Sequence, residues 1–149
     1  NDGKFLVAGD KNYNIRLYTT DNWQLTNTLR ANKAKIMQVK FSPHSKYLAS
    51  IGYDSKVFMW EMDDLNNSPL IMEDNGGFGR TVDFSHDDEM LVSGSGEFPN
   101  LIARPVRSNL LIDEFCSMIT RNFTPEEWEV YVGPDIEYQR TCSLLVTEN

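Results

Sequence analysis

The chain has 149 residues, 40% of them hydrophobic, and a formal net charge of -8. This length is typical of one domain, and the hydrophobic fraction is sufficient for a packed core, which excludes a wholly disordered chain. The acidic balance argues against a nucleic-acid phosphate backbone as the main partner. The sequence contains no apolar run of about 18 residues, so we predict no membrane-spanning segment.

The sequence repeats itself with a period near 42 residues. Residues 2–8 align with residues 44–50, an offset of 44 − 2 = 42. A third copy follows, because residues 39–43 align with residues 82–86 at an offset of 82 − 39 = 43. A period of this size is typical of the four-stranded blade of a β-propeller.

Alternating or short apolar runs between turn residues predict the strands of these blades. Residues 35–73 form one complete blade, which two incomplete blades flank. Several strands are apolar on both faces, and this suits strands that pack between neighbouring blades. The predicted strands are residues 5–9, 14–19, 23–30, 35–41, 47–51, 56–61, 69–73, 79–84, 90–94 and 100–104.

Residues 39–60, VKFSPHSKYLASIGYDSKVFMW, closely resemble a WD40 repeat. Together with its flanking copies, the resemblance covers residues 2–106. It implies an all-β fold, an incomplete WD40 β-propeller of about 2.5–3 blades of four-stranded antiparallel sheet. A short α-helical C-terminal tail, residues 107–149, follows the propeller segment, residues 1–106. We expect this tail to pack on the propeller.

The resemblance also implies a structural network inside the complete blade. In WD40 blades a His before the first strand bonds the Asp of a later turn, and a Ser or Thr and a Trp extend the chain of bonds. Ser50, Asp54 and Trp60 hold three of these positions, and Asn32 holds the position of the His. Because an Asn amide can donate to a carboxylate, we expect a structural bond from Asn32 to Asp54.

A ring needs roughly four to eight blades, so the remaining blades are expected from the same longer polypeptide or, alternatively, from other copies. WD40 rings bind partners mainly on the face made by the loops before the first strand and between the second and third strands. Simple packing at the rim is the alternative role for Met37 and Tyr53. The candidate partner-binding residues on this face are Lys33, Lys35, Met37, Tyr53 and Arg80.

The tail changes to a helical period. After a first helix that Ser108 caps, Thr124-Pro125-Glu126-Glu127 predicts a second helix with a capping box, and Gly133-Pro134 ends it. Cys116 and Cys142 either pair or are two buried reduced thiols, and the second reading is favoured. We expect three aromatic residues to pack the tail on the propeller: Phe115, Trp128 and Tyr131. The alternative is that the tail helix docks a partner.

Residues 116–128, CSMITRNFTPEEW, together with residues 131–133 and 138–142, resemble the C-termini of large bacterial WD40-repeat proteins. The resemblance is to proteins of Bacteroidetes-type bacteria in particular. In such proteins the propeller often follows an effector or NTPase module, so the resemblance implies a bacterial, regulatory context.

The sequence presents no constellation for catalysis. His44 and His86 occupy the same turn of successive copies. We expect these turns to lie far apart relative to a Zn–N bond of about 2 Å, so a two-His metal site is disfavoured. We therefore predict no catalytic residue, no metal and no cofactor.

The leading interpretation is a non-catalytic protein-interaction scaffold with protein partners, no nucleic acid and a cytoplasmic location. The first alternative is a ligand-sensing propeller that controls an attached effector or NTPase module. The second is an enzyme with its active site in the central channel, for which the innermost strands offer no converging acids or metal ligands.

Overall fold

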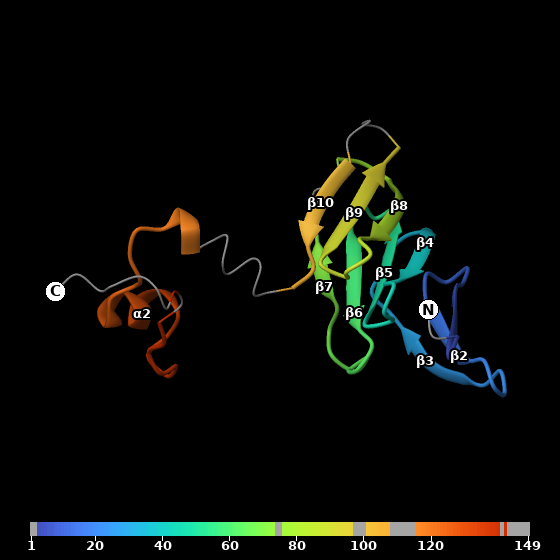
Figure 1. The fold of residues 1–149 in the computed structure, drawn as a ribbon, viewed down its shortest axis with the longest axis horizontal. Coiled ribbons are helices and arrows are strands. Elements are labelled where there is room, and N and C mark those ends of the chain that lie inside the picture. The colour runs from blue at the N-terminus through green and yellow to red at the C-terminus, as the bar shows by residue number, and fades with distance from the viewer. Residues whose placement is uncertain (1–2, 74–75, 97–100, 108–115, 141, 143–149) are drawn as a thin grey trace. The chain divides into compact units, whose positions relative to one another are not determined.

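The computed structural model describes residues 3–73, 76–96, 101–107, 116–140 and 142. The chain divides into two compact units, Asn1–Val106 and Arg107–Asn149. Figure 1 shows the strands of the first unit and the short helix α2 of the second. Within the described residues, no helix is both long enough and apolar enough to cross a membrane.

The described strands of the first unit form three antiparallel sheets that follow one another along the chain (Figure 1). The first sheet contains β1 (Phe5–Gly9), β2 (Ile15–Thr19) and β3 (Leu25–Leu29). The second contains β4 (Ile36–Phe41), β5 (Tyr47–Gly52), β6 (Val57–Glu61) and β7 (Leu70–Met72). The third contains β8 (Gly79–Phe84), β9 (Met90–Ser95) and β10 (Leu101–Pro105).

This arrangement confirms the predicted fold class. Every predicted strand is present, and the strands pair in sequence order as propeller blades do. The second sheet is the complete blade. Among the described residues the first sheet begins at β1, which aligns with the second strand of the repeat, so its innermost strand is not among them. In the described residues, the third sheet ends at β10 and has no outer strand.

The central blade is apolar on both faces, as the sequence pattern predicts. Successive residues of a strand point to opposite faces, so neighbours in β5 and β6 enter different cores. Ala49 and Ile51 pack toward the third sheet with Val82 and Leu91. On the other face, Leu48, Phe58 and Trp60 pack toward the first sheet with Ile15 and Leu29. The blade is therefore held by an apolar layer on each side.

The repeat is also visible in the backbone of the turns. Gly3, Ser45 and Asp88, which are equivalent in the three copies, have φ angles of 73°, 57° and 61°. Tyr13 and Ser55, another equivalent pair, have φ angles of 64° and 60°. Only one of these five positions is a glycine, the residue that favours this conformation. The blade geometry therefore sets the backbone here against local preference.

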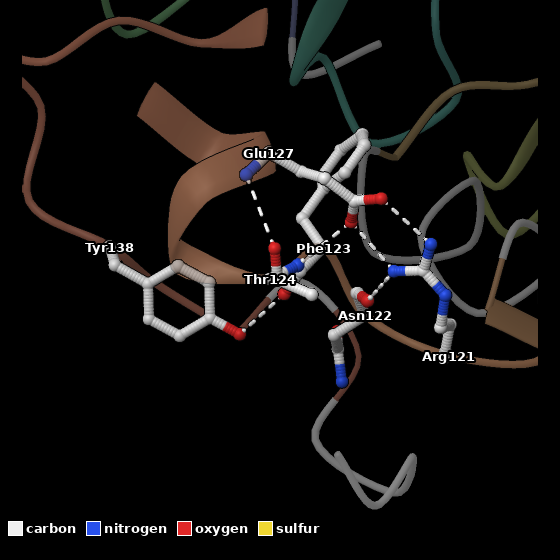
Figure 2. Close-up of polar contacts among 6 residues, drawn as sticks. All are labelled: Arg121, Asn122, Phe123, Thr124, Glu127 and Tyr138. Carbon is white, nitrogen blue, oxygen red and sulfur yellow. Dashed lines mark hydrogen bonds and ion pairs between the residues drawn. The ribbon is translucent and has the colours of Figure 1, made fainter. Parts of the chain in front are cut away.

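In the second unit, α2 (Pro125–Tyr131) begins as predicted (Figure 2). The Glu127 N–H donates to Thr124 Oγ1 at 3.2 Å, and the Thr124 N–H donates to Glu127 Oε2 at 2.9 Å. Val132 caps the C-terminus just before Gly133, whose φ is 133°. Most of the first predicted helix lies outside the described residues, and Cys116–Met118 is helical.

The two cysteines are bonded to each other, so the favoured reading of two reduced thiols is wrong. The Cα atoms of Cys116 and Cys142 lie 5.6 Å apart in this disulfide. The buried Asn122 side chain donates to Cys142 O and accepts from the Cys142 N–H, both at 2.9 Å. The disulfide and this amide pair together hold Cys142 against the segment before α2.

The aromatic residues of the tail contact one another. Trp128 Nε1 donates to Ile136 O at 2.9 Å, and its ring meets Tyr138 edge-on at 5.6 Å. The Tyr138 hydroxyl donates to Phe123 O at 2.9 Å (Figure 2). Tyr131 is 73% exposed and its ring lies 6.1 Å from that of Phe123. Phe115 lies outside the described residues, and packing of the tail on the propeller stays a prediction.

Candidate partner-binding surface

The structure brings three residues of the expected network together inside the central blade. Ser50 Oγ donates to Asn32 Oδ1 at 2.9 Å, and Asn32 Nδ2 lies 3.5 Å from Asp54 Oδ2. Asn32 and Ser50 are buried. Trp60 is buried in the apolar core, where its ring stacks on Phe58 at 6.2 Å, and the two network contacts above do not include it. The blade is thus linked from the loop before β4 to the turn after β5.

The strongest bond to Asp54 comes from the backbone. The Lys33 N–H donates to Asp54 Oδ2 at 2.7 Å, which is shorter than the 3.5 Å contact from Asn32. Asp54 Oδ1 is buried and has no hydrogen-bond partner among the described residues. The carboxylate therefore fixes the loop at Lys33 against the β5–β6 turn. Sequence reasoning identified the side-chain contact and missed the backbone one.

Aromatic and basic side chains gather at this end of the second and third sheets. We call Lys33, Lys35, Tyr53, Phe78 and Arg80 the aromatic–basic surface. All five are exposed. The set includes residues just before β4, just after β5 and at the start of β8. Antiparallel strands place these points at one end of the two blades.

The two rings of the aromatic–basic surface are in contact. Their centroids lie 5.0 Å apart with the planes 31° from parallel, although Tyr53 is 39% and Phe78 47% exposed. Lys35 Nζ lies 5.9 Å from the centroid of the Tyr53 ring, within the range of a cation–π contact. A rigid apolar ledge with a cation at its side results.

Close backbone packing holds this ledge. The Tyr53 N–H donates to Lys35 O at 2.9 Å, and a Cβ on Gly52 would meet the same oxygen at 2.3 Å. On the third sheet, the Gly96 N–H donates to Phe78 O at 3.0 Å. A Cβ on Gly96 would lie 2.1 Å from Arg80 Nε. The two glycines therefore permit the approach of the residues that carry the surface.

Met37 and Arg80 occupy equivalent bulges. In the pairing of β4 with β5, the register shifts between Ile36 and Gln38, so Met37 is the extra residue. In the pairing of β8 with β9, the shift between Gly79 and Thr81 makes Arg80 the extra residue. A bulge redirects a side chain. Met37 is half-buried, whereas Arg80 is exposed, so only Arg80 is available on the surface.

The cations of the aromatic–basic surface differ from three other basic residues of the unit, which pair with carboxylates. Arg16 pairs with Asp10 at 2.9 Å, Lys40 pairs with Asp83 at 3.1 Å, and Lys56 pairs with Glu73. Within the described ranges, no salt bridge involves the side chains of Lys33, Lys35 or Arg80. The surface thus offers unpaired positive charge in a chain whose net charge is -8.

Phe78 is the residue of this surface that the sequence did not identify. It directly follows Gly76-Gly77 in the loop before β8. Its place on this surface could have been predicted from the sequence, because it directly precedes the first strand of a repeat. An aromatic residue in that loop is the type of anchor that interfaces favour.

The two histidines lie closer together than expected. The His44 and His86 ring centroids are 6.0 Å apart, so the expected large separation is wrong. Equivalent turns converge because Asp88 of the third sheet reaches back to the second. The His44 N–H donates to Asp88 Oδ1 at 3.3 Å, and His44 Nδ1 lies 3.2 Å from Asp88 Oδ2. In the part of the chain that is described, no three potential ligands converge on a metal site.

One hollow lies in the second unit. It has a volume of about 350 Å³, and its lining includes Arg121 and Glu127. These two residues form the ion pair at the helix start that Figure 2 shows. The lining also includes Met118, Ile119 and Phe123. None of the candidate partner-binding residues borders it.

The sequential antiparallel blades and the polar network at Asp54 are the features expected of a partial WD40 propeller. Comparison with known proteins supports this class. Residues 23–61 match the family described as "WD domain, G-beta repeat". The matched segment runs from the outer strand of the first sheet to the third strand of the second, so the chain contains a WD40 repeat.

The chain is also similar to parts of several longer proteins. It is 35% identical over 71 residues to Protein HIRA of Dictyostelium discoideum, across 40% of this chain and 6% of that protein. It is 33% identical over 76 residues to Actin-interacting protein 1 of Caenorhabditis elegans, across 49% of this chain and 12% of that protein. It is 30% identical over 106 residues to "Probable cytosolic iron-sulfur protein assembly protein 1" of Kluyveromyces lactis, across 64% of this chain and 32% of that protein.

The chain thus spans about a third or less of these relatives. All three come from eukaryotes, and the resemblance of the tail to bacterial proteins stays a prediction.

Proposed function

We propose that this chain is a non-catalytic interaction scaffold that binds a protein partner through its aromatic–basic surface. The observation that carries the proposal is the exposed contact between Tyr53 and Phe78, bordered by unpaired cations. Exposed aromatic residues next to Arg or Lys are typical interface anchors. The WD40 repeat adds support, because such repeats are generally interaction modules.

The rigidity of the surface supports the same proposal. Gly52, Gly96 and the Asp54 network hold the loops by backbone contacts. A surface that is ordered before binding loses less conformational entropy when the partner docks. Folding has thus already ordered the binding loops.

We further propose that other blades complete the ring around these three sheets. In the part of the chain that the structure describes, β1 is the first strand of the first sheet and has one unpaired edge, and β10 is the last strand of the third sheet. Leu6 on β1 and Leu101 on β10 are 48% and 72% exposed. Such edges and side chains favour pairing with further strands. The parent polypeptide is the proposed source, and other copies are the alternative.

Site-specific photo-crosslinking tests the binding function. A photoreactive phenylalanine analogue replaces Phe78 in one preparation and Trp23 in another. Trp23 is 66% exposed but lies in the β2–β3 turn, at the other end of the blades. The proposal expects a defined protein adduct from position 78 and none from position 23. Equal adducts from both positions, or no adduct from position 78, would contradict it.

Among the described residues, no observation specifically favours the ligand-sensing alternative. The described hollow lies in the tail and is separate from the candidate surface. An attached effector or NTPase module is proposed only from the resemblance of residues 116–142 to bacterial proteins. Sequencing the gene that encodes this chain would test both the bacterial context and the attached module.

A further inference from the structure

We infer that the aromatic–basic surface recognises an acidic protein segment in which an aromatic or aliphatic residue adjoins Asp or Glu. This inference rests on the proposed function and specifies the chemistry of its partner. In the proposed complex, the apolar residue of the partner covers the rings of Tyr53 and Phe78. Its carboxylates lie against Lys33, Lys35 and Arg80.

The geometry of the two rings argues for an apolar anchor. A pair of rings 5.0 Å apart at 31° presents adjoining faces and edges, and roughly half of Phe78 remains in contact with water. Covering such a surface removes apolar area from water, at about 25 cal/mol per Å². One aromatic or aliphatic side chain matches the size of this ledge.

The charges argue for acidic neighbours of that anchor. Lys35 is held beside the Tyr53 ring, while Arg80 is redirected by its bulge and packed over Gly96. Lys33 follows the network residue Asn32 and is fixed through its own N–H. Three cations are thus spread around one apolar ledge. Carboxylates at matching positions would supply the charge-assisted contacts that unpaired cations favour.

The opposite end of the blades is the more acidic of the two, although Asp54 and Glu73 also lie at the end that carries the aromatic–basic surface. The turns β4–β5, β6–β7 and β8–β9 lie at that end. Within these turns the residues with charged side chains are Lys46, Asp63, Asp64, Asp87, Asp88 and Glu89. An acidic segment would be repelled there and attracted to the aromatic–basic surface. The charge distribution therefore selects one end of the blades for an acidic partner.

A nucleic acid would also offer negative charge and stacking groups, but it fits less well. Its backbone repeats a charge at every nucleotide and gains affinity by meeting many cations. This surface offers three, on a chain with a net charge of -8. A short acidic peptide needs only two or three matched carboxylates. We therefore assign the surface to a protein segment and make nucleic acid an outcome of the test.

Selection from an unbiased random-peptide display library on the full chain tests the inference. The expected enriched peptides place Asp or Glu next to an aromatic or aliphatic residue. The enriched peptides are then synthesised with a fluorescent label, and their Kd is measured by anisotropy against the wild type and three variants. A labelled oligothymidine is measured in parallel.

The variants separate the contributions of charge and ring. The triple variant K33E/K35E/R80E should raise the Kd at least about tenfold. F78A should raise the Kd about tenfold, which corresponds to a loss of about 1.4 kcal/mol of binding free energy, as expected for an interface anchor. The control K46E makes a single charge reversal of the same kind in the exposed β4–β5 turn and should leave Kd unchanged. Circular dichroism melting of each variant excludes unfolding as the cause.

The outcomes distinguish this inference from the proposed function. Enrichment of neutral or basic peptides, no enrichment, or unchanged affinity in the triple variant would overturn the acidic segment. Oligothymidine binding more tightly than the peptides would overturn it in favour of nucleic acid. If position 78 still crosslinks to a protein in those cases, the scaffold function survives. If that crosslink is also absent, both proposals fail.

Discussion

Glu127 shows how single contacts set the properties of this chain at the residue scale. Arg121 holds its carboxylate through two bonds, Nη1 to Oε2 at 2.6 Å and Nη2 to Oε1 at 2.8 Å. Hydrogen bonding from Arg121, followed by that from the Thr124 N–H, lowers the pKa of Glu127 from 4.5 to about 2. The ionised form thus completes the helix cap and the ion pair at once.

Arg121→Gln should therefore return the pKa of Glu127 toward 4.5. The folded pKa lies below the unfolded value, so the stabilisation from this carboxylate is present above pH 4.5 and is lost as the pH falls toward 2. A carbon-detected NMR titration of the Glu127 carboxyl measures the shift. Arg140→Gln, a change at another exposed arginine of the tail, is the control. An unchanged Glu127 titration in R121Q would refute the assignment.

Asp54→Ala should destabilise the first unit by about 1–3 kcal/mol. The substitution leaves the buried Asn32 side chain and the Lys33 N–H without their acceptor, and an unsatisfied buried group costs this much. Urea unfolding followed by circular dichroism measures the free energy of unfolding. Asp63→Ala, at an exposed turn position, should change it by less than about 0.5 kcal/mol. A similar loss in both variants would contradict the pinning role of Asp54.

Residue identities alone revealed part of this site. The Asn32–Asp54 contact followed from the resemblance to WD40 blades, because repeated turns place equivalent side chains alike. The 2.7 Å bond from the Lys33 N–H did not, because every residue except proline has an N–H and the sequence does not show which one is directed at Asp54. Convergence of His44 and His86 was missed for a related reason, since it depends on how far neighbouring blades splay.

At the scale of elements, the strands were predictable and their irregularities were not. Period-two patterns and turn residues identified the strands because burial on one or both faces leaves a direct mark on the sequence. The bulges at Met37 and Arg80 add one residue without breaking the apolar pattern. Their effect on side-chain direction could therefore be recognised only from the register in which the strands pair. The candidate surface depends on that register, so its composition was only partly foreseen.

Gly52→Ala should both destabilise the central blade and weaken partner binding. A Cβ at this position would meet Lys35 O at 2.3 Å, so β5 and the loop before β4 must separate. Overpacking of this kind costs about 1–3 kcal/mol, and it displaces Lys35 from the Tyr53 ring. Thermal melting and the peptide anisotropy assay measure the two effects.

The first sheet supplies a matched control for this substitution. Gly9→Ala places a Cβ 3.4 Å from the Ile36 side chain, an ordinary van der Waals contact. Its effect on stability should be below about 1 kcal/mol, and the affinity should not change. If the two alanine variants behaved alike, the close approach at Gly52 would not be what holds the surface.

At the scale of the whole molecule, the two units are stabilised by different means. The first buries two apolar layers around its central blade. The second has the disulfide between Cys116 and Cys142, and α2 contains no buried residue. Small units with little core are commonly held by disulfides, which persist in oxidising compartments. The disulfide therefore gives the second unit a covalent constraint, whereas the first unit relies on apolar burial.

Replacing both cysteines by serine should unfold the second unit and spare the first. The disulfide closes a loop across a sequence separation of 26 residues, for which the chain-entropy model gives about 3–4 kcal/mol. Both cysteines lie within the second unit, so the sheets keep their own stabilising contacts. Hydrogen exchange should show lost protection at the Trp128 and Val132 amides, with the amides of β5 and β6 unchanged. Met118→Ser, at a residue 72% exposed in the same segment, should preserve protection throughout. Lost protection in β5 and β6 would show instead that the tail and the propeller segment fold as one cooperative structure.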